Sequence, residues 1–98
     1  MQKLSEAELH AAVPGLNGWQ IVNGKLHRVY KFTDFIHAFG FMATAALGIE
    51  KAGHHPEWFN VYNRVTVDLT TNDAGGITQK DIDLAKLLDD IAKKLQSQ

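Results

Sequence analysis

The dipeptide Asn23-Gly24 is the feature that most constrains the fold, because it stands between two runs of alternating apolar and polar residues. Both residue types accept the positive φ angles that a two-residue hairpin turn requires. The flanking runs, Trp19 to Val22 and Lys25 to Phe32, are therefore predicted to pair as antiparallel strands, with Val22 opposite Lys25. One face of this hairpin is apolar enough to lie on a core. It carries Trp19, Ile21, Leu26, Tyr30 and Phe32, with Arg28 as the one misfit.

A second pair of strands is predicted further along the chain, around Tyr62-Asn63. Trp58 to Val61 forms the first strand and Arg64 to Thr70 the second, in which β-branched and aliphatic residues alternate with polar ones. Asn63 is expected to take the left-handed turn conformation, which asparagine tolerates.

Three helices are predicted around these hairpins. Ser5 and Glu8 have the spacing of a capping box, with Leu4 and Leu9 as a hydrophobic staple, so a short helix begins at Glu6 and ends near Val13. The last helix begins at a second capping box, from Thr78 to Asp81. Its core stripe is Leu84, Leu88, Ile91 and Leu95.

The central helix is predicted from Asp34 to Gly53, with Thr33 as its cap. Its first apolar stripe is Phe35, Phe39, Met42, Ala46 and Ile49. A second stripe beside it is Ile36, Ala43 and Leu47. The apolar face is therefore broad enough for both a sheet and a neighbouring subunit, and Gly40 and Gly48 allow close approach of a neighbour.

The resulting order is α-β-β-α-β-β-α, which favours an α+β fold with a four-stranded antiparallel sheet and helices packed on one face. At 98 residues and 45% hydrophobic composition, residues 1–98 are expected to form a single domain. A core of this size leaves apolar surface that a partner subunit could cover, so oligomerisation is plausible.

Composition excludes several classes of function. The net charge of -1, with basic and acidic residues well mixed, argues against direct nucleic-acid binding. The absence of cysteine excludes disulfides, cysteine-ligated zinc and thiol nucleophiles. The longest apolar run, Phe39 to Ile49, is too short to cross a membrane, and the N-terminus does not resemble a signal peptide. A cytoplasmic protein is the expectation.

The pair His54-His55, followed by Pro56, indicates acid/base chemistry at a junction between helix and strand. Histidine is the side chain whose ordinary pKa, about 6.5, suits proton transfer near neutrality. The alternative is that one histidine packs or caps while the other is solvated. Proton transfer on a small neutral or weakly polar substrate is the chemistry that the remaining sequence leaves open.

Other kinds of site fit the sequence less well. Glu50 precedes His54 by four residues, but adjacent side chains in an extended segment point to opposite faces, so no metal site is predicted. Ser5 is assigned to a cap and Ser97 to the tail, which leaves no serine nucleophile. Gly75-Gly76 before a helix could hold a phosphate, yet a glycine pair without a fuller motif is more often a turn.

The residues Glu50, His54-His55-Pro56, Tyr62 and Asp81 resemble the signature of the pterin-4a-carbinolamine dehydratases, a family that includes the dimerisation cofactors of hepatocyte nuclear factor. The run from Pro56 to Asn63 is the most typical part of that resemblance, which covers nearly the whole chain. The resemblance implies dehydration of 4a-hydroxytetrahydrobiopterin to quinonoid dihydrobiopterin. This step recycles the tetrahydrobiopterin cofactor of aromatic amino acid hydroxylases, and it needs no metal or cofactor.

The resemblance also implies roles for individual residues. His54 is similar to the acid/base histidine of the family, His55 to the companion that holds the pterin, and Glu50 would orient or polarise the two. The remaining pocket residues would be Pro56, Trp58, Thr71, Asn72, Asp73 and Ala74. Trp58 could stack on a flat ring, but a core position is an equal alternative. The family assembles as homotetramers, dimers of dimers with sheets joined edge to edge and helices bundled.

Two positions complicate this assignment. Asp81 matches the signature, but its place in a capping box is a sufficient structural reason for it, and we assign it a structural role. Asn72 stands where the family usually carries a third histidine, and an amide cannot transfer protons. We therefore expect a working but weaker dehydratase, or one restricted to one 4a stereoisomer.

Two alternatives remain open at this point. The chain could be a binding module without catalysis, because animal members of the family bind a homeodomain transcription factor as dimerisation cofactors. The retention of His54 and His55 with Glu50 argues against a pure scaffold. A role near molybdopterin metabolism is suggested only by the pterin pocket.

Overall fold

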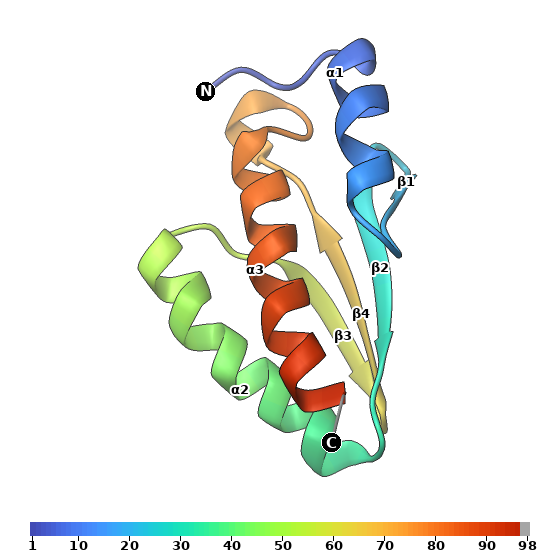
Figure 1. Cartoon of the computed structure of the whole chain (residues 1–98). Coiled ribbons are helices and arrows are strands. Elements are labelled where there is room, and N and C mark those ends of the chain that lie inside the picture. The colour runs from blue at the N-terminus through green and yellow to red at the C-terminus, as the bar shows by residue number, and fades with distance from the viewer. Residues whose placement is uncertain (97–98) are drawn as a thin grey trace.

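The computed structural model describes residues 1–96 and has the predicted order of elements (Figure 1). The helices and strands are α1 (Glu6–Ala12), β1 (Gln20–Val22), β2 (Lys25–Lys31), α2 (Phe35–Ala52), β3 (Glu57–Val61), β4 (Arg64–Leu69) and α3 (Gln79–Gln96). Two short 3-10 turns, η1 (Val13–Gly15) and η2 (Asn72–Ala74), follow α1 and β4. Ser97, which the sequence assigns to the tail, lies outside the described residues.

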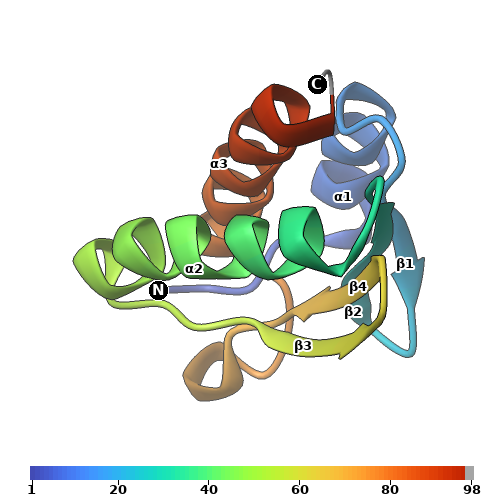
Figure 2. The ribbon, with the colours of Figure 1, turned by 90° about the horizontal axis from the view of Figure 1, so that it is seen from below.

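The four strands form one antiparallel sheet in the order β1-β2-β4-β3. Viewed along the sheet, the three helices lie on the same face of it (Figure 2). The α+β prediction is therefore confirmed. Because β4 returns between β2 and β3, the end of β4 and the start of β3 come close to the start of α3, and this arrangement positions the site described below.

Both hairpins have the predicted two-residue loops. Asn23 and Gly24 have φ angles of 52° and 77°, and Val22 pairs with Lys25. In the second hairpin the left-handed residue is Tyr62, with φ of 51°, rather than Asn63 as predicted. Asn63 is instead tied to the end of β2, where its side chain donates to the carbonyl of Phe32 at 3.0 Å.

The core face of the first hairpin is largely as predicted, since Trp19, Leu26, Tyr30 and Phe32 are buried. Ile21 is the exception and is 45% exposed, because it lies on the short edge strand β1. Arg28 does lie on this face. Its guanidinium donates to Asp89 of α3 at 2.8 Å and lies 4.4 Å from the centre of the Tyr30 ring.

The buried face of α2 differs from the predicted one. It is formed by Ala38, Phe41, Ala45 and Ile49. Of the predicted stripe Ile49 is buried and Met42 partly buried, whereas Phe35, Phe39 and Ala46 are exposed. Because α2 is apolar around much of its circumference, spacing alone could not select the stripe that faces the sheet. The two small alanines let the helix approach the sheet, with the Phe41 side chain between them.

The ends and neighbours of α2 also refine the prediction. Asp34, rather than Thr33, caps the helix, and its carboxylate accepts from the backbone N–H of His37 at 2.9 Å. Close approach is confirmed at Gly48, where a Cβ would stand 2.8 Å from a methyl carbon of Leu87 on α3. It is not confirmed at Gly40, which has no neighbour of this kind within 4 Å.

The capping box of α1 is present, and at α3 only its Asp81 half is formed, because the Thr78 hydroxyl accepts from Lys80 rather than from Asp81. At α1, Ser5 and Glu8 exchange hydrogen bonds of 2.8 and 3.1 Å. At α3, the Asp81 carboxylate accepts from the Thr78 N–H at 2.9 Å, and the Thr78 hydroxyl accepts from the Lys80 N–H at 3.2 Å. The α3 stripe is confirmed, with Leu84 and Leu88 buried and Ile91 and Leu95 partly buried.

Within residues 1–96, no helix combines the length and the apolar character needed to span a bilayer.

Candidate active site

The two histidines occupy the short connection between α2 and β3. Gly53 ends α2 in the left-handed conformation, with φ of 66°, and its N–H donates to the carbonyls of Ile49 and Glu50. Glycine adopts this conformation without the steric cost that other residues incur. The chain then passes through His54, His55 and Pro56 before β3 begins at Glu57. Both histidines are thus held on a short segment anchored at each end by regular structure.

His54 is directed inward and meets a buried carboxylate. Its Nε2 lies 2.5 Å from Oδ1 of Asp81, in the first turn of α3. The side chain of His54 is 13% exposed and that of Asp81 is fully buried. The other Asp81 oxygen, Oδ2, accepts from the Thr71 hydroxyl at 2.8 Å and from the Thr78 N–H at 2.9 Å. A structural role as a helix cap therefore accounts for only part of what Asp81 contacts.

His55 is directed outward and meets an exposed carboxylate. Its Nε2 lies 2.7 Å from Oε1 of Glu50, and the two side chains are 62% and 78% exposed. The histidines thus have separate partners, as the alternation of an extended segment predicts. Glu50 contacts His55, whereas the carboxylate that contacts His54 is Asp81. The sequence did not assign Asp81 to the site, because its partner His54 lies 27 residues earlier in the chain.

The pairing with Asp81 determines which nitrogen of His54 faces the exterior. An ionised carboxylate only accepts hydrogen bonds, so opposite an ionised Asp81 the proton is on Nε2 and Nδ1 keeps a lone pair. Within residues 1–96, every buried side-chain nitrogen or oxygen has a hydrogen-bond partner, and the His54 ring makes its hydrogen bond through Nε2. Nδ1 is therefore the accessible nitrogen, and it can accept a proton and return it.

The other predicted pocket residues lie at different depths. Pro56 is half-buried, and Trp58 is partly buried against the core and pairs with Val67, so its packing role is met. Thr71 is half-buried and contacts Asp81. Asn72 and Asp73 are exposed on η2, and Ala74 is half-buried.

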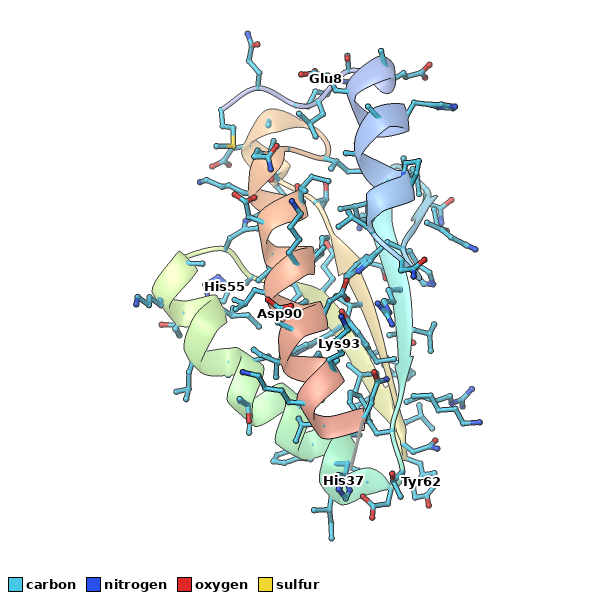
Figure 3. All side chains as sticks on the ribbon, in the orientation of Figure 1. Glu8, His37, His55, Tyr62, Asp90 and Lys93 are labelled. Atoms are coloured by element: carbon cyan, nitrogen blue, oxygen red, sulfur yellow. The ribbon has the colours of Figure 1, made fainter. Side chains whose placement is uncertain are left out.

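Tyr62, which belongs to the sequence signature, lies away from this site. It is 62% exposed at the turn between β3 and β4. Figure 3 shows it at the far tip of that hairpin, whereas His55 lies beside the end of α2. The position of Tyr62 in the turn, with its positive φ, is a structural feature of the hairpin.

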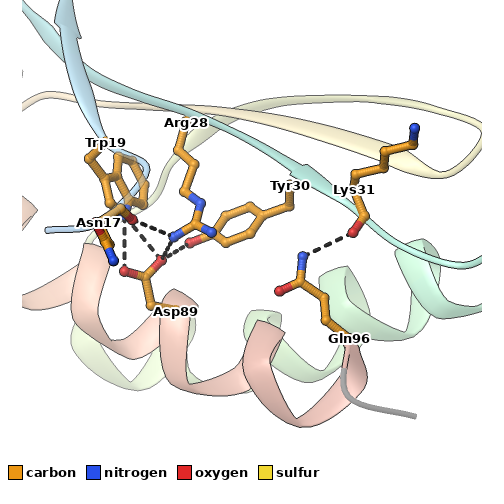
Figure 4. Close-up of polar contacts among 7 residues, drawn as sticks. All are labelled: Asn17, Trp19, Arg28, Tyr30, Lys31, Asp89 and Gln96. Carbon is orange, nitrogen blue, oxygen red and sulfur yellow. Dashed lines mark hydrogen bonds and ion pairs between the residues drawn. The ribbon is translucent and has the colours of Figure 1, made fainter.

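A second polar cluster lies further along α3, where Asp89 accepts hydrogen bonds from three side chains of the β1–β2 region (Figure 4). The donors are the Trp19 indole at 3.0 Å, the Arg28 guanidinium at 2.8 Å and the Tyr30 hydroxyl at 2.5 Å. Burial, with the hydrogen bond to Asp89, raises the pKa of Tyr30 well above its usual range. The signal for this cluster in the sequence was Arg28, whose place on an apolar face requires a carboxylate partner.

Within residues 1–96, neither the His54–Asp81 pair nor the His55–Glu50 pair is part of a metal site. In the described part of the chain, no three histidine, aspartate or glutamate side chains gather as ligands for one ion. An apolar hollow of about 670 Å³ lies elsewhere, between α1, the β1–β2 turn and the loop before α3. Its polar lining residues, Lys3, Ser5, Glu6 and His10, are all exposed. We place the candidate site at His54 because a buried acid/base pair, rather than an apolar hollow, supplies the chemistry.

Comparison with known proteins identifies the family to which this sequence is similar. The sequence profile of the family described as Pterin 4 alpha carbinolamine dehydratase matches residues 2–91. A protein of Solibacter usitatus, named provisionally as a pterin-4-alpha-carbinolamine dehydratase, is 66% identical over 90 residues, which are 92% of this chain and 95% of that protein. A similarly named protein of Brucella ovis is 51% identical over 92 residues, with the same two shares.

The fold is also shared with a solved structure. A crystal structure from Brucella melitensis, described as a transcriptional coactivator/pterin dehydratase, superposes with a TM-score of 0.89 at 50% sequence identity. The superposition covers 93% of this chain and 99% of that one. Because the family profile matches residues 2–91, nearly the whole length, the chain belongs to the pterin-4-alpha-carbinolamine dehydratase family.

Proposed function

We propose that this chain dehydrates 4a-hydroxytetrahydrobiopterin to quinonoid dihydrobiopterin by histidine acid/base catalysis, and so recycles tetrahydrobiopterin for aromatic amino acid hydroxylation. Membership of a dehydratase family supports the reaction class. The observation that carries the mechanism is the His54–Asp81 pair, a largely buried imidazole held by a fully buried carboxylate. Such a pair holds an imidazole in a fixed orientation for general acid/base catalysis.

The reaction converts a carbinolamine to an imine. The bond between C4a and its hydroxyl oxygen breaks, the hydroxyl takes a proton and leaves as water, and the proton on the adjacent ring nitrogen is lost as the C=N bond forms. One proton is delivered and one is withdrawn, so the catalyst ends unchanged. In our proposal Nδ1 of His54 carries this proton, and Asp81 stabilises the imidazolium that forms between the two transfers.

The exposed pair has a different role in this proposal. His55 holds the pterin and exchanges protons with water, and Glu50, at 2.7 Å, orients it. Pro56, Trp58 and the loop residues Asn72, Asp73 and Ala74 complete the pocket. The exposed position of Asn72 on η2 leaves room for an imidazole. We expect Asn72→His to raise turnover on at least one 4a stereoisomer, and no increase on either isomer would contradict the idea that Asn72 weakens the enzyme.

We also propose the assembly and setting that the family resemblance implies. A homotetramer would cover the exposed apolar side chains of α2, which are 49 to 77% exposed. They are Phe35, Ile36, Phe39 and Leu47. The edge strand β3 is available for pairing with a second sheet. We further propose that the chain forms a single domain and that it works in the cytoplasm without a metal or cofactor.

A second candidate function is binding without catalysis. It is favoured by one observation, the description of the Brucella melitensis structure as a transcriptional coactivator as well as a pterin dehydratase. The same exposed face of α2 would then receive a protein partner. The two functions differ in what they require of His54, because a binding surface on α2 does not use it.

The test is stopped-flow dehydration of synthetic 4a-hydroxytetrahydrobiopterin at neutral pH, measured against the uncatalysed background. We expect wild type to accelerate the reaction and His54→Ala to lose about 10²- to 10⁴-fold of the rate, the usual contribution of a general acid/base group. If wild type gives the background rate but binds dihydrobiopterin, the dehydratase proposal is wrong and the binding function is favoured.

A further inference from the structure

We propose that Thr71 and Thr78 are positioning residues, whose hydroxyls form a chain of hydrogen bonds with one direction that orients Asp81 and holds His54 with its proton on Nε2. This inference deepens the proposed function and rests on it for its effect on turnover. It assigns Thr71 a role through Asp81 instead of the substrate contact expected from the sequence.

Two of the hydrogen bonds in this series are made to a single oxygen of Asp81. The Thr71 hydroxyl lies 2.8 Å from Oδ2, and the Thr78 N–H lies 2.9 Å from the same atom. The two threonine hydroxyls are themselves 2.8 Å apart. The Thr78 hydroxyl also accepts from the backbone N–H of Lys80 at 3.2 Å. Each hydroxyl has one proton to donate, so these contacts restrict one another.

The direction of the chain follows from the groups that cannot change role. Oδ2 of Asp81 already accepts from a backbone N–H, as a carboxylate oxygen does. The Thr71 proton must point to it, because an ionised carboxylate cannot donate. The Thr71 oxygen can then only accept from Thr78, which accepts in turn from Lys80. The order is Lys80 N–H to Thr78, Thr78 to Thr71, and Thr71 to Asp81.

The remaining Asp81 oxygen is thereby directed at His54. With Oδ2 held by two donors, Oδ1 is left to accept from Nε2 of His54 at 2.5 Å. The start of α3 favours a negative charge on Asp81, because the first-turn N–H groups carry the positive end of the helix dipole. An ionised Asp81 requires the proton on Nε2, which leaves Nδ1 for the substrate.

Helix capping alone does not account for this arrangement. A cap needs Thr78 and Asp81, which satisfy backbone N–H groups at the start of α3. Thr71 is outside the helix, at the end of β4, and its hydroxyl contacts only these two side chains among the hydrogen bonds described for residues 1–96. Its backbone is fixed by its bridge to Gly76, with N–H to carbonyl at 2.9 Å. Thr71 therefore ties the Asp81 carboxylate to the sheet.

The experiment compares Thr71→Val, which keeps the shape but removes the hydroxyl, with Thr71→Ser, which keeps the hydroxyl. Imidazole ¹⁵N chemical shifts report the protonated nitrogen of each histidine, and His54→Ala assigns the His54 signals. We expect Nε2–H at His54 in wild type and Thr71→Ser, and a mixture of tautomers in Thr71→Val. The His55 signals are an internal control, because Glu50 lies outside the chain of hydroxyls, and we expect them unchanged.

Turnover gives the second readout. We expect Thr71→Val to lose roughly tenfold in kcat with KM within about twofold, and Thr71→Ser to stay within about twofold of wild type in both. Asp34→Ala is the matched capping control, since it removes a helix cap from the far end of α2 and should leave the His54 tautomer unchanged.

The outcomes separate this inference from the proposed function. Nδ1–H at His54 in wild type, which needs no variant to fold, overturns the inference. Identical tautomers and turnover in Thr71→Val and Thr71→Ser also overturn it. If wild type shows no dehydration above background but the tautomers behave as expected, the positioning role is supported and the proposed function is wrong.

Discussion

Two carboxylates on α3, Asp81 and Asp89, each join the helix to distant parts of the chain, but their partners differ in kind. Asp81 is fully buried and holds a histidine, which can change its charge near neutral pH. Asp89 is 24% exposed at its side chain and holds an arginine, a tyrosine and a tryptophan, which do not. The same helix thus carries the proposed catalytic pair at its start and a structural contact about two turns further on.

This difference shows that burial of a carboxylate does not by itself indicate catalysis. Both aspartates satisfy several donors, and both link residues far apart in sequence. What distinguishes them is whether a partner can exchange a proton in the pH range where the protein works. The comparison therefore predicts that substitutions at Asp81 and at Asp89 affect different measured quantities.

The largest expected effect is on turnover at Asp81. Asp81→Asn keeps the shape of the side chain but removes the charge that orients His54 and stabilises its imidazolium, so we expect kcat to fall on the order of 10²-fold or more. The same stopped-flow assay measures it, with thermal unfolding to show that the variant is folded. Turnover within threefold of wild type would show that Asp81 acts only as a cap.

Asp89→Ala should instead reduce stability. The substitution leaves the buried Tyr30 hydroxyl and the Trp19 indole without their acceptor and Arg28 without its carboxylate, so we expect a loss of about 3 kcal/mol in the free energy of unfolding. Urea unfolding measures the loss, and kcat of the folded protein should stay within about threefold. Asp90→Ala, at an exposed neighbour, is the control and should change stability by less than about 0.5 kcal/mol.

The features that depend on local sequence patterns could be predicted from the sequence. The two-residue turns and the capping boxes each involve residues within a few positions of one another, so their physics is readable directly from spacing. The cap formed by Asp81 was predicted for this reason. Its contact with His54 was not, because it joins residues 27 positions apart and depends on how the sheet brings β3 and β4 to the start of α3.

The same limit explains the differences at Asp89 and at α2. The contacts of Asp89 span 59 to 70 residues, and Arg28 was the only local sign of them. The predicted buried face of α2 was wrong because the helix has several apolar stripes. Which stripe faces the sheet depends on which side chains fit there, and Ala38 and Ala45 allow close approach. The order of elements and the lengths of the turns were therefore predictable, and long-range pairing was not.

The Asp89 cluster also predicts a dependence of stability on pH. Burial and the hydrogen bond to Asp89 raise the pKa of Tyr30 above the value of about 10 expected in the unfolded chain. The folded protein then keeps the Tyr30 proton at a pH where the unfolded chain loses it, so this contribution is fully present below about pH 10 and is lost as pH rises above that value.

Tyr30→Phe tests this dependence. At pH 8 the variant should be about 1 kcal/mol less stable than wild type, because the hydrogen bond to Asp89 is lost. The difference in stability between wild type and Tyr30→Phe should narrow between pH 10 and pH 11, because the variant lacks the hydroxyl whose titration destabilises wild type. Urea unfolding at a series of pH values measures it. Tyr62→Phe, at a tyrosine that is 62% exposed, is the matched control, and a parallel slope for both variants would contradict the prediction.

The smallest expected effect comes from a third carboxylate, Glu50, which extends the comparison to the surface. Glu50 and His55 form their pair at 78% and 62% exposure, where water screens the interaction. We therefore expect Glu50→Gln to lower kcat/KM by less than about threefold, against 10²-fold or more for Asp81→Asn. Equal losses in the two variants would mean that Glu50 and His55 are desolvated when substrate binds, because only a pair removed from water could contribute as much as the buried one.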